Sequence, residues 1–553
     1  MVSAALIWVY MTVTCYILGF AVLELLSVRQ GCPIGKESSY LYAGIVTVTV
    51  YAQFFSIFYK VGLAANGILL LICGVLIWVF RKEFREHLHT LRLTITPVKA
   101  GVVVLLFLLF AYGTGTGIIH YDTGLYHAQS VRWIEEYGIV PGLGNLHSRL
   151  AYNSASFCLS ALYSFAFLGG QSYHCCAGFL AFLLAVTCGE GFSRKRVKKP
   201  LLSDLVRIMG IYYLMIIFDE MISPASDYFM VLGVFYIVIR WLDLLEKEER
   251  SAVPYGLLCV MGVWVVTVKL SGALILLLTI KPALQMIREK MGKQIALFMG
   301  TGFLAGLPFL IRNVILSGWL VYPFTFIDLF DFDFKIPKGM ADYDSREIQV
   351  WGRGFSDVTR YEEPVTKWLP EWAAGLDAVN KVFLLLALSG ILLFLAYCIF
   401  ALVKKRKDMA DTLLVMGTMG MSFLFWLTSA PLIRYGCIYL WVFPALAWGF
   451  LYLKASPGFD KYKIYLLLLV IVGAYKIGAF TLETAKSATG RYLLRQKDYE
   501  NFETVPYELH GYTFYYPKEG DRTGYDDFPA SPVKAEDIFR RESIEDGFRD
   551  VIH

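Results

Sequence analysis

Residues 382–403 read VFLLLALSGILLFLAYCIFALV and contain no charged side chain. A helix of about twenty apolar residues spans the roughly 30 Å hydrocarbon core of a bilayer. A helix also satisfies its own backbone hydrogen bonds there. Runs of similar length and composition recur along the 553-residue chain. We therefore expect an all-α protein that crosses the membrane many times.

The overall composition supports this fold class. Hydrophobic residues make up 57% of the chain and charged residues 18%, whereas a soluble domain is about 25% charged. An outer-membrane barrel would show short strands of alternating polarity instead of long apolar runs. The net charge of +5 is small, so nothing in the composition indicates a nucleic-acid partner.

The orientation follows from the basic residues in short loops, which stay on the cytoplasmic side. Four such loops cover residues 81–92, 194–199, 281–293 and 404–407. Working outward from them predicts roughly fourteen transmembrane helices. They are expected at about residues 4–27, 40–59, 63–80, 100–118, 172–192, 204–218, 228–245, 254–267, 270–287, 294–311, 382–403, 412–428, 436–453 and 464–481. It also predicts that the N-terminus and residues 119–171, 312–381 and 482–553 lie outside.

This topology divides the chain into three parts. We expect N-terminal transmembrane helices over residues 1–99, a helical core over 100–481 with outer loops at 119–171 and 312–381, and a small extracytoplasmic tail over 482–553. Within the first outer loop, the apolar run 152–168 is interpreted as a helix lying in the membrane interface. The aromatic, Gly- and Pro-containing tail predicts short strands and turns.

The first outer loop contains the motif HYDTGLYHAQSVRWIEEYG, residues 120–138. If the segment is helical from Asp122, then Asp122, Tyr126, Gln129 and Trp133 share one face. An acid, a phenol and an amide together can position and deprotonate a hydroxyl group. The alternative is that Asp122 only caps the helix. A divalent metal held by Asp122 and His127 is a further, weaker alternative, because the histidine spacing matches no zinc pattern.

A second acidic motif, DEMISPASDY at residues 219–228, is expected in a short outer turn. Carboxylates beside hydrocarbon are costly, so they often mark a functional site. For Asp227 a functional role and a helix-capping role are equally favoured. Asp219 and Glu220 are interpreted as solvated turn residues.

Three cations are expected at outer helix ends, against the usual charge distribution. They are Lys269 in TVKLSG, Arg312 next to Asn313 in RNVILSGWLVYP, and Arg434 in APLIRYG. Placing Lys269 in the turn between two shorter helices avoids burying an ammonium group at mid-bilayer. A single such arginine would often only extend its head group to the interface. Three cations opposite an acidic loop instead predict a shared phosphate site.

These motifs, in this order, resemble the GT-C superfamily of membrane glycosyltransferases, specifically the branch that uses polyprenyl-phosphate sugars. The resemblance covers about residues 100–453. The chain looks even more similar to an uncharacterised group of bacterial multi-pass membrane proteins with YDTGLYH-like, RN…G…YP-like and RYG-like motifs. The resemblance implies a GT-C-like fold in a bacterial plasma membrane, with the active site on the extracytoplasmic side.

The resemblance also implies residue roles and partners. Asp122 would be the catalytic base of an inverting sugar transfer, and the three cations would hold the lipid phosphate. No nucleotide or other cofactor is implied with certainty, and a divalent metal stays open because a single acid stands where many members have two. The partners would be a polyprenyl-phosphate-linked sugar, a glycan, lipid or protein acceptor and membrane lipids. The expected substrate contacts are Tyr126, His127, Gln129, Asp227, Lys269, Arg312, Asn313, Tyr322, Arg434 and Tyr435.

Two other classes of function compete with sugar transfer. A polysaccharide polymerase or ligase acting on lipid-linked glycans would depend on Arg312 and Arg434 and could dispense with Asp122. A transporter or flippase would place charges within its helices and repeat a pattern of broken helices. The sequence contains few charges deep in its apolar runs and no internal repeat, so the transporter ranks last.

Overall fold

The protein is described by a computed structural model that covers residues 1–30, 37–192, 200–455, 459–487, 491–536 and 538–550. One of the four basic loops used for the predicted orientation, residues 194–199, lies outside these ranges. The described chain is mostly helical, which confirms an all-α protein with many apolar helices.

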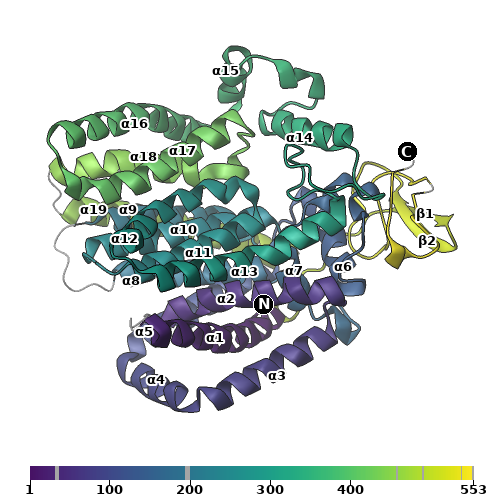
Figure 1. Cartoon of the computed structure of the whole chain (residues 1–553), viewed down its shortest axis with the longest axis horizontal. Coiled ribbons are helices and arrows are strands. Elements are labelled where there is room, and N and C mark those ends of the chain that lie inside the picture. Colours follow the sequence, from purple (N-terminus) through teal and green to yellow (C-terminus); the bar gives the residue numbers. More distant parts are fainter. Residues whose placement is uncertain (31–36, 193–199, 456–458, 488–490, 537, 551–553) are drawn as a thin grey trace.

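The N-terminal helices lie along one side of the bundle (Figure 1, purple). The helices α1 and α2 are apolar and pack against each other, and α3 joins the more polar α4 at an angle of 86°. The bounds are α1 Val2–Gln30, α2 Glu37–Phe58, α3 Leu63–Val79, α4 Arg81–Thr94 and α5 Pro97–Gly115.

The central helices form the core, with α10 buried along nearly its whole length between α8, α9, α11 and α18. After α5 come α6 Ala128–Glu136, α7 Ala155–Leu162, α8 Cys176–Phe192, α9 Leu202–Ile216, α10 Ser226–Glu246, α11 Ala252–Val268, α12 Ile280–Arg288 and α13 Gly292–Ser317.

The helices α14 to α18 cover the other side of the bundle and the end near the tail (Figure 1, green). The helix α19 packs against α9, and the short α20 contacts α1 and α5. The bounds are α14 Lys338–Gly352, α15 Val365–Gly375, α16 Ala378–Val403, α17 Ala410–Thr428, α18 Ile433–Ala455, α19 Phe459–Ser487 and α20 Arg491–Leu494.

Ten helices in the described part of the chain are long and apolar enough to cross a membrane, or eleven if the bent pair α3–α4 forms one span. All ten coincide with predicted spans. Of the other four predicted spans, residues 63–80 fall in that bent pair, and residues 172–192, 204–218 and 254–267 form the short helices α8, α9 and α11. The predicted count of fourteen is therefore not confirmed, although helices exist at all fourteen positions.

The apolar run 152–168 differs from its predicted role. Its central part forms the helix α7, and all eight residues of α7 are buried. A helix lying in the membrane interface would instead present an apolar face to lipid and a polar face to water. The helix α7 is apolar because protein surrounds it, so the interfacial interpretation is wrong for α7. The end of the run forms a separate 3₁₀ helix, Ala166–Leu168, in which Leu168 is exposed.

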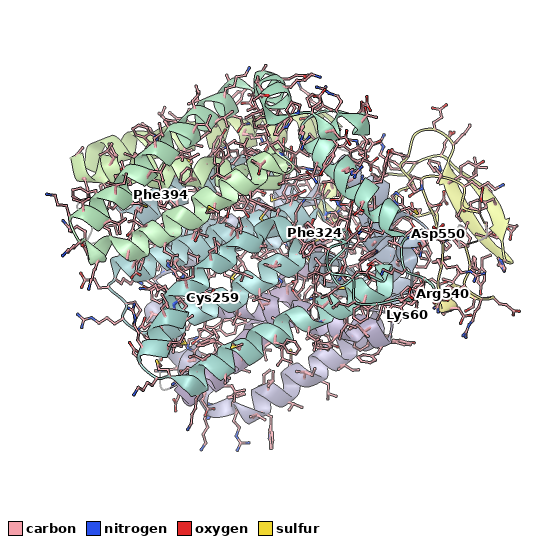
Figure 2. All side chains as sticks on the ribbon, turned by 45° about the horizontal axis from the view of Figure 1, so that its top comes forward. Lys60, Cys259, Phe324, Phe394, Arg540 and Asp550 are labelled. Atoms are coloured by element: carbon pink, nitrogen blue, oxygen red, sulfur yellow. The ribbon has the colours of Figure 1, made fainter. Side chains whose placement is uncertain are left out.

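The tail contains the predicted strands and turns. Strands β1 Thr504–Leu509 and β2 Tyr512–Pro517 form an antiparallel hairpin in which Tyr507 lies opposite Phe514. Phe514 is fully buried and belongs to a cluster with Trp133 of α6. Figure 2 shows Arg540 and Asp550 of the tail at one end of the molecule, away from Cys259 and Phe394 in the bundle. The tail is thus docked on the loop that carries the first acidic motif.

Candidate functional site

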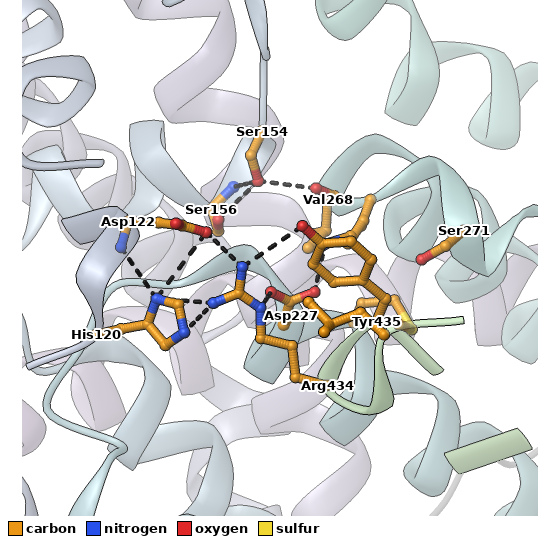
Figure 3. Close-up of polar contacts among 12 residues, drawn as sticks. His120, Asp122, Ser154, Ser156, Asp227, Val268, Ser271, Arg434 and Tyr435 are labelled. Atoms are coloured by element: carbon orange, nitrogen blue, oxygen red, sulfur yellow. Dashed lines mark hydrogen bonds and ion pairs between the residues drawn. The ribbon is translucent and has the colours of Figure 1, made fainter. Parts of the chain in front are cut away.

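Acidic, basic and aromatic side chains from four separate segments meet at one end of the helical bundle (Figure 3). Asp122 comes from the first loop, Asp227 from the first turn of α10, Lys269 from the break after α11, and Arg434 and Tyr435 from the start of α18. Two carboxylates and two cations therefore balance one another in a cluster that the sequence divides among distant motifs.

Arg434 lies at the centre of this cluster. Its Nη2 donates a hydrogen bond to Oδ2 of Asp122 at 2.5 Å, and its Nε lies 3.5 Å from Oδ2 of Asp227. About a quarter of the Arg434 side chain is exposed. Its guanidinium group therefore bridges both acids while part of it stays open to a ligand.

Lys269 completes the cluster from the opposite side. Its ammonium group pairs with the Asp227 carboxylate and lies 3.9 Å from the centre of the Tyr435 ring. The Arg434 guanidinium carbon lies 5.1 Å from the centre of the same ring. Both cations thus contact the same aromatic ring, an arrangement that stabilises positive charge in a partly dehydrated place.

The position of Lys269 follows from a break between two helices. The α11 helix ends at Val268, Lys269 has extended backbone angles, and a 3₁₀ helix follows over Leu270–Thr279. Ser154 of the first loop donates a hydrogen bond to the Val268 carbonyl oxygen at 2.8 Å, which satisfies one end of the helix. The prediction of two shorter helices with Lys269 between them is confirmed.

The RYG motif positions Arg434 through a similar interruption. Gly436 has non-helical backbone angles inside α18. A Cβ atom at this position would lie 2.3 Å from Cδ1 of Trp426, so only glycine fits. The Trp426 indole nitrogen also donates to the Leu432 carbonyl oxygen at 2.9 Å. This close packing fixes the turn that points Arg434 into the cluster.

Asp122 precedes a π-helical turn, Thr123–His127, in which the Ala128 N–H donates to the Thr123 carbonyl oxygen. The Asp122 side chain makes no capping hydrogen bond, so it pairs with Arg434 rather than capping the helix. A π turn contains one more residue than an α turn. The α-helical spacing that predicted one face for Asp122, Tyr126, Gln129 and Trp133 therefore does not hold.

Burial and charge fix the protonation states around Asp122. Burial alone would raise the pKa of the Asp122 carboxyl, but the charge of Arg434 holds it below its ordinary value. Burial, then the charge of Arg434, lowers the pKa of His120. Burial lowers the pKa of His127 to about 3. At neutral pH the acid is thus ionised and both imidazoles are neutral.

His120 belongs to the site, although the sequence predicted no role for it. The second terminal nitrogen of Arg434 contacts the His120 ring. The backbone N–H of His120 donates a hydrogen bond to the Ser223 hydroxyl at 2.8 Å, which joins the first loop to the turn before α10. Its place two residues before Asp122 in HYD was the only signal in the sequence.

Arg312 does not join the other two cations. It is buried, and its guanidinium donates to the Ser56 hydroxyl and to Oδ1 of Asn153 at 3.0 Å. Asn313 is also buried, and its amide nitrogen has no hydrogen-bond partner among the described residues. The predicted three-cation phosphate site is therefore reduced to Lys269 and Arg434.

Tyr322 and Gln129 likewise form hydrogen bonds with residues outside the cluster. The Tyr322 hydroxyl donates to Asp344 of α14 at 3.2 Å. The Gln129 amide nitrogen donates to the carbonyl oxygens of Gly524 and Asp527 in the tail. Neither side chain contacts the Asp122 cluster, so neither is placed to touch a substrate there.

Tyr126 and His127 remain close to the cluster. The Tyr126 ring is half-buried and packs edge-on against the rings of His127 and Phe157. Nδ1 of His127 lies 3.3 Å from the Thr123 hydroxyl, and its ring centre lies 6.5 Å from that of His120. These residues form the wall behind Asp122.

The donor set has no clear metal centre. Among the residues that the structure describes, no group of three His, Cys, Asp or Glu side chains is arranged to hold a metal ion. The Asp122 and His120 side chains approach each other to 3.9 Å, with Arg434 between Asp122 and Asp227. These carboxylates therefore have a guanidinium as their counter-ion.

Comparison with protein families identifies one match. Residues 1–441 match a family model described as a domain of unknown function, DUF8201. The chain belongs to the DUF8201 family. Arg434, Tyr435 and the other members of the cluster all lie inside the range matched by DUF8201, and the C-terminal tail lies outside it. No curated protein and no solved structure matches the chain.

Proposed function

We propose that this DUF8201 protein is a membrane glycosyltransferase of GT-C type. It would move a sugar from a polyprenyl-phosphate donor to a hydroxyl of an envelope glycan, lipid or protein acceptor, on the extracytoplasmic side of a bacterial plasma membrane. The observation that carries the proposal is the convergence of Asp122, Asp227, Lys269 and Arg434 at one end of a bundle of membrane-spanning helices.

The proposed reaction needs a base and a place for negative charge. The acceptor oxygen attacks the anomeric carbon, the bond from that carbon to the phosphate oxygen breaks, and the acceptor proton passes to Asp122. The leaving lipid phosphate gains one negative charge in this step. Lys269 and Arg434 would bind that charge more strongly in the transition state than in the ground state, which lowers the barrier.

The pairing of Asp122 with Arg434 supports this scheme. In the cluster each cation pairs with a carboxylate. A donor phosphate that takes over Arg434 would leave Asp122 without its counter-ion, and the pKa of a carboxyl rises when an opposite charge is removed. Donor binding would thus convert a weak base into a stronger one next to the acceptor.

The polymerase or ligase alternative would depend on both Arg312 and Arg434. Arg434 lies in the cluster, but Arg312 is buried and bound to Ser56 and Asn153. Asp122, which that alternative does not need, lies instead in the partly exposed cluster. The sugar-transfer proposal therefore has the better support.

Replacing Asp122 by Asn tests the proposal. The change keeps the shape of the side chain and removes the base, so glycan transfer should fall by about 10²–10⁴-fold. Mass spectrometry of envelope glycans and lipids would compare cells lacking the protein with cells carrying the wild type or a variant. Asp219→Asn is the matched control, because Asp219 pairs with Lys476 outside the cluster. Normal transfer by Asp122→Asn would refute the catalytic role.

A further inference from the structure

The C-terminal tail lies across the segment that carries Asp122. Residues 521–528, here called the tail strap, read DRTGYDDF. The backbone N–H groups of Thr523 and Gly524 both donate to the carbonyl oxygen of Gly124, at 3.0 and 2.9 Å. This carbonyl lies within the π turn directly after Asp122. The strap thus binds the backbone of the site loop rather than only covering it.

The residue before Asp122 is held by two strap side chains. The Tyr121 hydroxyl donates to the Asp521 carboxylate, and the Arg522 guanidinium carbon lies 4.7 Å from the Tyr121 ring centre. The same guanidinium lies 4.5 Å from the ring of Phe502, at the start of the tail hairpin. Tyr121 is therefore fixed between an acid and a cation although half of its surface is exposed.

The helix after the π turn is held from the other side. The Gln129 amide nitrogen donates to the carbonyl oxygens of Gly524, at 3.1 Å, and Asp527, at 2.8 Å. The Arg132 guanidinium donates to the Tyr525 carbonyl oxygen at 2.6 Å and lies 4.8 Å from the Phe528 ring centre. The strap therefore contacts the site loop on both sides of Asp122.

The backbone of this loop depends on the contact. π turns are rare and usually occur at functional sites. A Cβ atom on Gly124 would lie 2.8 Å from the Phe502 ring, so the loop and tail approach too closely for any other residue. None of the strap's hydrogen bonds involves the Asp122 carboxylate, which pairs with Arg434.

We propose that the tail strap is a positioning element, which fixes the π turn so that the Asp122 carboxylate meets Arg434. Gln129 and Arg132 act through the strap and do not touch substrate. The tail lies beyond the residues that match DUF8201, so the strap is a part of the site outside the family-matched range.

The first test does not depend on the proposed sugar transfer. Hydrogen exchange of residues 119–128 would be measured by mass spectrometry in the full-length purified protein. Asp521→Ala with Arg522→Ala should speed this exchange by about tenfold, because the local opening free energy falls. Gln129→Leu should do the same from the helix side. Lys518→Ala, which removes an exposed pair with Glu503, is the control.

The exchange result decides the inference directly. Unchanged exchange in residues 119–128, both for Asp521→Ala with Arg522→Ala and for Gln129→Leu, would overturn the proposed role of the strap. Exchange that rises equally throughout the bundle would also overturn it, because the strap would then only stabilise the whole fold.

A second readout rests on the proposed function. If the strap sets the Asp122–Arg434 pairing, loosening it should move the acid limb of the pH–activity profile upward. A purely structural role would lower the active fraction without moving that limb. Absence of sugar transfer in the wild type would count against the proposed function and leave the exchange test of the strap intact.

Discussion

The two ends of α10 carry two different charge clusters. Near the start of the helix, Asp227 pairs with Lys269 and Arg434, and about a quarter of each cation is exposed. Near the other end, Asp243 receives two hydrogen bonds from Arg207, at 2.8 and 2.7 Å, and the Arg207 side chain has no exposed surface. One helix therefore has an open cluster and a sealed one.

The two clusters differ in whether a ligand can replace one member of an ion pair. A sealed, bidentate pair cannot exchange its partner for a ligand, and removing one member leaves an uncompensated buried charge. A partly exposed pair contributes little to stability, and water or an anion can replace either partner. Charge near hydrocarbon alone does not identify a functional site; partial exposure and convergence from several segments do.

The sealed cluster predicts the largest effect on stability. Asp243→Ala should destabilise the protein by about 3–5 kcal/mol, because Arg207 would stay buried without its main partner. Thermal unfolding in detergent would measure this loss. The double variant Arg207→Met with Asp243→Leu should recover part of it, because Asp204 and Arg240 would still lose one partner each. If Lys269→Ala lowered the unfolding temperature as much as Asp243→Ala, the two clusters would not differ as described.

Glu135 sharpens the comparison, because this carboxyl is buried and forms no ion pair with any residue that the structure describes. It is buried and accepts hydrogen bonds from the hydroxyl of Ser172 and from the hydroxyl of Tyr525, which belongs to the tail strap. Burial raises the pKa of Glu135 from 4.5 to about 7. The folded protein therefore keeps a proton that the unfolded chain loses between these two values.

The stability that Glu135 contributes falls as the pH rises. Below pH 4.5 the carboxyl is protonated in both the folded and the unfolded state, and its stabilising contribution is fully present. As the pH rises through about 7, the free energy of unfolding falls by at most about 3 kcal/mol. Unfolding midpoints at several pH values would measure it, with Glu135→Gln as the control that lacks this component. An identical pH dependence in Glu135→Gln would contradict the assignment.

The sequence predicted those parts of the fold that depend on local composition. Apolar length predicts helices, and all ten membrane-spanning candidates lie where the sequence placed them. The cost of burying an ammonium group correctly placed Lys269 at a break between helices. The run forming α7 could not be assigned, because an apolar helix looks the same whether lipid or protein surrounds it.

The candidate site was predictable only in part. Asp122, Asp227 and Arg434 stand out as charges beside apolar runs, and the structure brings them together. Arg312 has the same local pattern, but its partners Ser56 and Asn153 come from α2 and from the first loop, and no local rule identifies them. The role of Gln129 depended on a π turn, which shifts the helical register, and on the tail 395 residues later.

A substitution in the open cluster is predicted to give the smallest change in free energy. Arg434→Ala should weaken binding of a polyprenyl phosphate about tenfold, equal to about 1.4 kcal/mol, while thermal stability changes by about 1 kcal/mol or less because the pair is partly exposed. Lys476→Ala is the matched control, since Lys476 pairs with Asp219 outside the cluster. Binding would be followed by titrating the purified protein in detergent. Unchanged affinity would remove Arg434 from the phosphate site. A stability loss as large as that of Asp243→Ala would mean that the Asp122–Arg434 pair holds the fold together as the sealed cluster does.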